Sequence, residues 1–168
     1  MRLFAITGLV ASVVTFPVAV PAQDHTAHQA HASHALHDSI MVPIKALFDG
    51  MRTRDTALMR SAFAPGALLA QPPRPGQPLA FETVDGFIAT VSGAPAGPAW
   101  DEKLYDPEIR VDGSLASVWT FYTFTAGDYS HCGVDAMHLL RTPSGWKITT
   151  LADTRRRTGC EVTGKKPV

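Results

Sequence analysis

Histidines and carboxylates gather in two parts of this sequence, and each part suggests its own chemistry. In the N-terminal segment HTAHQAHASHALH every third residue is a histidine, namely His25, His28, His31, His34 and His37. Nearer the C-terminus, two sets combine a histidine with an aspartate: His131 with Asp135, and His138 with Asp153. A histidine and a carboxylate are the minimum for proton transfer on a small carbonyl compound. The sequence therefore offers a candidate metal-binding tract and a candidate acid–base site.

The histidine tract has two interpretations. Imidazoles at this spacing can form chelates of Zn, Cu or Ni, and cleavage after Ala22 would place His25 third in the mature chain, an arrangement that suits Cu(II) and Ni(II). Alternatively, the segment from Gln23 to Asp38 is a solvated tether whose metal affinity is incidental. Its low complexity, with Leu36 as the one large apolar residue, predicts a mobile linker over residues 23–38.

The first 22 residues resemble a secretory leader. Met1-Arg2 gives a positive start, an apolar stretch follows, and Val20-Pro21-Ala22 offers small residues for cleavage. We therefore expect a signal peptide over residues 1–22 and a periplasmic or secreted protein. An oxidising compartment favours a disulfide between Cys132 and Cys160, the only two cysteines; the alternative is two unpaired thiols.

Charge and motifs exclude several classes of function. Fifteen basic residues balance fifteen acidic ones, so no overall field recruits nucleic acid or an anionic membrane surface. We expect neither as a partner, and no membrane association once the leader is removed. No phosphate-binding glycine loop, Cys-x-x-Cys pair, nucleophile elbow or His-Glu-x-x-His motif occurs, so no cofactor is predicted.

Periodicity predicts one domain over residues 39–160 and a C-terminal tail over residues 161–168. Helical spacing indicates three helices: one from Ser39 to about Met51, one from Asp55 to Phe63 and one from Phe81 to Ser92. Strands are predicted at Ala67 to Ala70, Trp100 to Val111, Leu115 to Thr125, Tyr129 to Arg141 and Trp146 to Arg156. Helices followed by long strands indicate an α+β fold with the helices packed on one face of a curved, mainly antiparallel sheet.

Alternation along the last two strands decides which candidates share a face. If the loop from Thr142 to Gly145 is a simple four-residue connection, Val134 pairs with Asp153. His138, Asp153 and Arg155 then share one face, while His131 and Asp135 lie on the other. The two aspartates belong to one site only if a bulge shifts the register.

Each candidate also has a plain structural interpretation. Asp153 and Arg155 can form an ordinary ion pair, His131 can lie in solvent near a strand end, and His138 can be a hydrogen-bonded core residue. The strand aromatics can be core or can line a pocket. As ligand contacts we predict Trp119, Tyr122, His138 and Arg155, and as catalytic candidates His131, Asp135 and Asp153.

Three segments resemble the nuclear-transport-factor-2-like (NTF2-like) superfamily, whose cone-shaped α+β fold is shared with polyketide cyclases and ketosteroid isomerases. They are IKALFDGMRTRDTALMRSAFAPGALL, LASVWTFYTF and HCGVDAMHLLRTPSGWKITTLADTRR. The resemblance covers about Ser39 to Cys160 and implies an internal pocket between helices and sheet, and often a homodimer through the convex face.

The resemblance leaves the function open, because the fold hosts hydrolases, isomerases, cyclases and plain binding proteins. FAPGA, after the second predicted helix, lacks the carboxylate that acid–base relatives often have there. The leading hypothesis is an exported protein that binds a small, partly apolar molecule. The alternatives are an isomerase, cyclase or dehydratase using a histidine–aspartate pair, and a metal-binding protein that uses the histidine tract.

Overall fold

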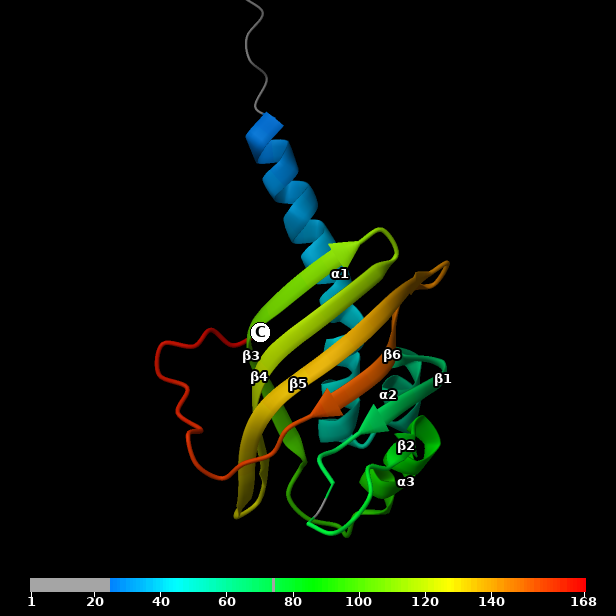
Figure 1. The fold of residues 1–168 in the computed structure, drawn as a ribbon, viewed down its shortest axis with the longest axis vertical. Coiled ribbons are helices and arrows are strands. Elements are labelled where there is room, and N and C mark those ends of the chain that lie inside the picture. Colours follow the sequence, from blue (N-terminus) through cyan, green and yellow to red (C-terminus); the bar gives the residue numbers. More distant parts are fainter. Residues whose placement is uncertain (1–24, 74) are drawn as a thin grey trace, which may run out of the picture.

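The computed structural model describes residues 25–73 and 75–168, with side chains from residue 33 onward. The predicted signal peptide lies outside the described residues and stays a prediction. Three helices pack on a six-stranded, mostly antiparallel sheet, which confirms the predicted α+β fold (Figure 1). None of the described helices is long and apolar enough to cross a membrane.

Helix α1, His25–Thr53, is longer than predicted. Its C-terminal part buries Ile40, Ile44 and Leu47 against the sheet, as the spacing indicated. The backbone is also helical through the described part of the predicted linker, and this part projects beyond the sheet in Figure 1. Alanine-rich sequence favours helix, and a packed helix extends more easily than a new one nucleates. Ser39, where the predicted helix begins, lies inside α1 and donates its hydroxyl to the Leu36 carbonyl (2.7 Å).

Two shorter helices begin at capping side chains. Helix α2, Thr56–Ala62, follows Asp55, whose carboxylate accepts a hydrogen bond from the Leu58 amide at 2.9 Å. Helix α3, Val84–Gly93, follows Thr83, whose hydroxyl accepts from the Gly86 amide at 3.1 Å. The predicted third helix therefore starts three residues late, because its first residues form a strand instead.

The strands form one sheet in the order β2-β1-β6-β5-β4-β3. They are β1 (Phe63–Ala70), β2 (Phe81–Thr83), β3 (Asp101–Asp112), β4 (Leu115–Ala126), β5 (Tyr129–Thr142) and β6 (Gly145–Asp153). Every neighbouring pair is antiparallel except β1 with β6, which is parallel. Helix α1 lies against β3 and β6, and its buried residues join the inward residues of β4 and β5 in one core between the helices and one face of the sheet.

A bulge in the last hairpin changes the register that a simple loop predicts. Near the loop Leu139 pairs with Ile148, but farther along His138 pairs with Thr150, so Thr149 is an extra residue on β6. Asp135 consequently lies opposite Asp153, not Val134. The expected set of His138 with Asp153 is therefore wrong, because a bulge of one residue reverses the alternation of the strand beyond it.

The C-terminal tail is fixed at both ends. The predicted disulfide is confirmed: Cys132 on β5 is bonded to Cys160, with their Cα atoms 5.5 Å apart. The tail crosses the outer face of the sheet and returns to the edge strand β3 (Figure 1). There the Asp106 amide donates to the Lys166 carbonyl (3.0 Å) and the Val168 amide to the Leu104 carbonyl (3.2 Å).

Candidate functional site

A two-chambered cavity lies between the helices and the inward face of the sheet. Its outer chamber has a volume of about 470 Å³ and its inner chamber about 50 Å³. Residues shared by both linings join the chambers, namely Met51, Gln71, Phe87, Glu102 and Arg155. A molecule in the outer chamber can therefore extend a small group into the inner one.

The outer chamber is lined largely by aromatic side chains. Phe87 comes from α3, Trp100 precedes β3, and Phe124 and Tyr129 flank the turn between β4 and β5. Trp100 meets Phe124 edge to face, with ring centroids 5.9 Å apart. Such surfaces bind flat or apolar molecules through dispersion and ring contacts.

The inner chamber is acidic. Glu102 of β3, Asp135 of β5 and Asp153 of β6 line it together with Arg155. Arg155 Nε donates to Asp153 Oδ2 at 2.6 Å, so the predicted ion pair is present at the cavity, with the Asp153 side chain 8% exposed and the Arg155 side chain 44% exposed. The pKa of Arg155 is raised: burial acts against its charge, but the hydrogen bond and charge of Asp153 outweigh it.

Tyr122 of β4 contacts the Asp153 carboxylate of this ion pair. Its hydroxyl is within donating distance of two acceptors, the Thr154 carbonyl oxygen at 2.8 Å and Asp153 Oδ2 at 3.2 Å, which share its single hydrogen. Burial, with the nearby charge of Asp153, raises the pKa of Tyr122 well above its ordinary value. Tyr122 therefore stays a neutral hydrogen-bond donor beside Asp153. It is not among the residues that line either chamber, so its role as a ligand contact stays a prediction.

Asp135 is the most deeply buried carboxyl of the chamber. Asp135 is 2% exposed, and its Oδ2 has no hydrogen-bond partner among the described residues. Burial raises its pKa to about 7; a hydrogen bond from Glu102 and the charge of Arg155 act against burial, and the charge of Asp153 acts with it. Burial, followed by the charge of Asp135, also raises the pKa of Glu102. Two carboxyl groups hydrogen-bond only if one is protonated, so this pair holds a proton near neutral pH.

His131 belongs to the outer chamber. It is 8% exposed, so the interpretation that places it in solvent is wrong. Its ring packs at 4.7 Å from Phe124 and 5.5 Å from Tyr129 between centroids. Burial, with the charge of Arg155, lowers its pKa, so the ring is neutral near pH 7. Its Nδ1 is buried without a hydrogen-bond partner in the described part of the chain, and a ligand can supply one.

A glycine makes room for these groups. Gly133 lies between His131 and Asp135 on the inward face of β5. A Cβ at this position would stand 1.7 Å from the Thr154 carbonyl oxygen and 2.8 Å from the Tyr122 ring. No larger residue fits, so glycine allows the chain after β6 to approach Tyr122 and hold Asp153 in place.

Two predicted ligand contacts lie elsewhere. Trp119 and His138 project from the opposite, convex face, where they line a separate groove with Glu108 and Arg110. His138 Nδ1 is 3.0 Å from Thr150 Oγ1, and the residue is exposed, so it belongs neither to the cavity nor to the core. The bulge at Thr149 explains why His138 and Asp153 do not form one site. It moves Asp153 to the inward face, whereas His138 lies on the opposite face.

The histidine tract is only partly within the described side chains. His34 and His37 are described, whereas the side chains of His25, His28 and His31 lie outside the described residues. His37 Nδ1 lies 3.7 Å from an Asp38 carboxylate oxygen. Among the described side chains no group of three or more metal-ligating residues is arranged to hold an ion. The metal hypothesis for this tract remains a prediction.

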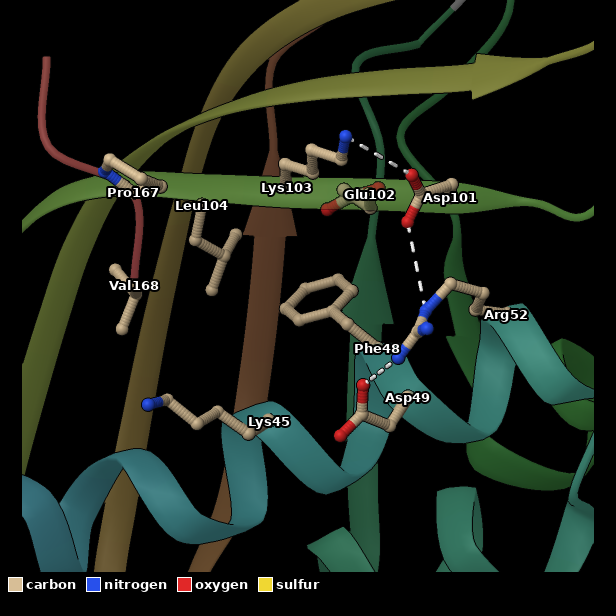
Figure 2. Close-up of a pocket in the computed structure, with 10 residues that line it drawn as sticks. All are labelled: Lys45, Phe48, Asp49, Arg52, Asp101, Glu102, Lys103, Leu104, Pro167 and Val168. Carbon is tan, nitrogen blue, oxygen red and sulfur yellow. Dashed lines mark hydrogen bonds and ion pairs between the residues drawn. The ribbon is translucent and has the colours of Figure 1, made fainter.

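A third space adjoins the cavity along the edge of the sheet. This groove, of about 550 Å³, lies between α1 and β3 and is closed at one end by Pro167 and Val168 (Figure 2). Its charges pair with one another: Arg52 bridges Asp49 and Asp101, and Lys103 also reaches Asp101 (Figure 2). Glu102 lines this groove as well as both chambers, so it stands where they meet.

Glu102 is the site residue that sequence reasoning missed. In the segment DEKLY its neighbour two residues on is Leu104, an inward residue opposite Tyr122. Alternation therefore places Glu102 on the inward face, and this signal was present in the sequence.

Comparison with known proteins assigns the class. The fold is similar to a protein from Kribbella flavida (14% identity, 73% of this chain and 92% of the other, TM-score 0.63). It is also similar to an NTF2-like protein with a cystatin-like fold from Novosphingobium aromaticivorans (15% identity, 82% and 94%, TM-score 0.60). A third match is described as a putative dehydratase from the NTF2-like family of Streptomyces avermitilis (17% identity, 71% and 94%, TM-score 0.56).

These likenesses establish an NTF2-like fold, as the sequence resemblance implied. Residues 35–151 match the family described as putative lumazine-binding, and the chain belongs to that family. Its members share the NTF2-like fold. A comparison with curated proteins finds no significant match.

Proposed function

We propose that this protein is an exported binding protein for a small, flat, partly apolar molecule, which it holds in the two-chambered cavity. The observation that carries the proposal is that two adjacent chambers share five lining residues, with four aromatic side chains around the outer chamber and three carboxyl groups at the inner one. Ligand sites of this kind combine apolar walls with a few convergent polar groups. The disulfide between Cys132 and Cys160 supports export, because such bonds persist in oxidising compartments.

The family description suggests a first probe, lumazine. This bicyclic heterocycle is flat and carries ring N–H groups, which match an aromatic chamber that leads to carboxylate acceptors. We expect the ring system to lie beside Trp100 and Phe124, and its N–H groups to reach Glu102.

Titration of purified protein with lumazine, followed by its fluorescence, tests this proposal. We expect saturable binding of one lumazine per chain, weakened about fivefold by Trp100→Ala, since an aromatic contact contributes about 1 kcal/mol. Trp119→Ala is the matched control, because Trp119 lies on the convex face. Absence of saturable binding would exclude lumazine as the ligand, and equal loss in both variants would contradict its placement in the cavity.

Acid–base catalysis is the second candidate function. The bulge in β6 places Asp135 opposite Asp153, and their surroundings differ: Asp153 is ion-paired with Arg155, whereas Asp135 is buried with a pKa of about 7. Neighbouring carboxyl groups in unlike environments are suited to serve as acid and base. Isomerisation, cyclisation or dehydration of a small carbonyl compound would use such a pair, with the Tyr122 hydroxyl orienting Asp153.

Identification of a ligand that remains bound through purification, by mass spectrometry, would supply the compound for a turnover assay. If the pair is catalytic, Asp135→Asn should reduce the turnover rate at least 100-fold, while the affinity for the ligand changes far less. His138→Asn, on the convex face, is the control and should retain full turnover. Turnover that survives Asp135→Asn would eliminate this second candidate.

We also infer a homodimer through the convex face. Trp119, Leu115 and Leu140 lie there 55%, 47% and 45% exposed; Leu115 is opposite Leu140, and Trp119 lies farther along β4 on the same face. Exposed apolar residues gathered on one face are typical of an interaction surface. Analytical ultracentrifugation of the protein and of Trp119→Asp tests this inference: the variant should be monomeric, and a monomeric parent would refute it.

A further inference from the structure

The inner chamber holds more negative than positive charge. Glu102, Asp135 and Asp153 reach it from three different strands, and Arg155 is the one cationic side chain in its described lining. Arg155 directs its Nε to a single oxygen, Asp153 Oδ2. Buried carboxylates need a counter-charge or donors, because leaving water without them is costly. The chamber is therefore short of positive charge and of hydrogen-bond donors.

Two oxygens define where the missing donors belong. Asp135 Oδ2 and Asp153 Oδ1 are both buried, and neither has a hydrogen-bond partner in the described part of the chain. Asp135 is 98% buried and lines the chamber, and the register of β5 and β6 places it opposite Asp153. Native proteins rarely leave such acceptors unsatisfied, so these oxygens point to a ligand group.

The size of the chamber limits that group. A volume of about 50 Å³ admits one small head group, since a water molecule occupies about 30 Å³ in the liquid. A metal ion does not suit the geometry, because no group of three metal-ligating side chains converges among the described residues. An anion does not suit the charge, because Arg155 already faces Asp153.

We propose that the cavity selects molecules that carry a primary ammonium group on a flat aromatic body. The ammonium group lies in the inner chamber among Glu102, Asp135 and Asp153, and the aromatic ring lies in the outer chamber. The ammonium N–H groups can donate to the two unpartnered oxygens, Asp135 Oδ2 and Asp153 Oδ1, in charge-assisted hydrogen bonds. A neutral hydroxyl has one hydrogen and no charge, so it cannot match them. This inference rests on the proposed binding function and specifies the ligand class for the same site.

Calorimetric titration with matched probes tests the proposal. 2-Phenylethylamine and 2-phenylethanol have nearly the same shape, but only the amine is charged at neutral pH. We expect the purified protein to bind the amine at least tenfold more tightly than the alcohol. Asp135→Asn should remove that preference and leave the affinity for the alcohol within about twofold.

Two further variants keep the result interpretable. Glu102→Gln should also reduce the preference at least threefold, which provides a second reading if Asp135→Asn is poorly folded. Glu108→Gln, also on β3 but on the convex face, should leave the preference unchanged. Equal affinity for amine and alcohol, or a preference that survives both cavity variants, would overturn the proposal.

Lumazine separates this inference from the proposed function. If lumazine binds in the cavity but the amine is not preferred, the binding function stands and the ammonium specificity is refuted. If lumazine and both phenyl probes all fail to bind, the binding function itself is refuted.

Discussion

Replacement of Asp135 by asparagine should change how the stability of this protein depends on pH. An aspartate in an unfolded chain titrates near about 3.9, whereas burial raises the pKa of Asp135 to about 7 in the folded protein. Between these values the folded state keeps a proton that the unfolded state releases. The stabilising contribution of the Asp135 carboxyl is therefore complete below about pH 4 and is lost as pH rises toward 7.

The size of the effect follows from the shift. Each pKa unit corresponds to about 1.36 kcal/mol, so the free energy of unfolding should fall by about 4 kcal/mol between pH 4 and pH 8 on account of Asp135. Because Asp135 is 2% exposed, solvent screens this effect little. Asparagine does not titrate, so the stability of Asp135→Asn relative to the parent should rise with pH by about that amount.

Other groups at the site also titrate, and the comparison with the parent accounts for them. Glu102 also has a raised pKa, so its contribution falls with pH in the same direction. His131 has a lowered pKa, so stability rises with pH through its range. Tyr122 and Arg155 do not change charge between pH 4 and pH 8. These contributions are present in both proteins, with one exception. Without the charge of Asp135 the pKa of Glu102 is raised less, so the contribution of Glu102 falls less with pH in Asp135→Asn, which adds to the expected difference.

Urea unfolding at pH 4.5, 5.5, 6.5 and 7.5, with the disulfide kept oxidised, measures this difference. Glu108→Gln, which removes an exposed carboxylate from β3, should follow the parent at every pH. A difference between parent and Asp135→Asn that stays constant across the range would show that Asp135 is not held protonated by burial.

Three further predictions address the glycine, the disulfide and the aromatic lining. Gly133→Ala should lower the free energy of unfolding by about 1–3 kcal/mol through overpacking, whereas Gly93→Ala, with open space around its Cα, should change it by less than about 1 kcal/mol in chemical unfolding. Cys160→Ser should lower the free energy of unfolding by roughly 3–4 kcal/mol in the same measurement. Hydrogen exchange should show faster exchange of the amides that join the tail to β3. Unchanged exchange would mean that the tail is held without the disulfide. Near-ultraviolet circular dichroism should report a ligand-induced change in the parent and in Trp119→Ala but not in Trp100→Ala, and loss of the signal in both would place the ligand elsewhere.

Much of the fold could be predicted, because helical and alternating periods are local properties. The order of helices and strands, the α+β class and the disulfide follow from spacing, turns and the count of cysteines. The helical conformation of residues 25–38 was missed, since low complexity indicated a linker although the alanine-rich sequence also suits a continued helix.

The candidate site depended on a single residue that periodicity does not show. Alternation placed His131 and Asp135 together on one face without deciding whether that face lines the cavity, and Asp153 joins them there only through the extra residue Thr149. A bulge depends on how two strands settle against the core, and no local pattern in ITTLAD marks it. The same uncertainty wrongly grouped His138 with Asp153.

The bonded tail also protects the edge of the sheet. Strand β3 is the outer strand of the sheet, and a bare edge of this length presents unpaired amides and carbonyls to other molecules. Residues 166–168 satisfy part of that edge near Asp106, where a bulge and Pro107 interrupt the ladder. A chain that lost its disulfide would therefore expose a template for strand addition, and its first failure would be aggregation between copies rather than loss of the cavity.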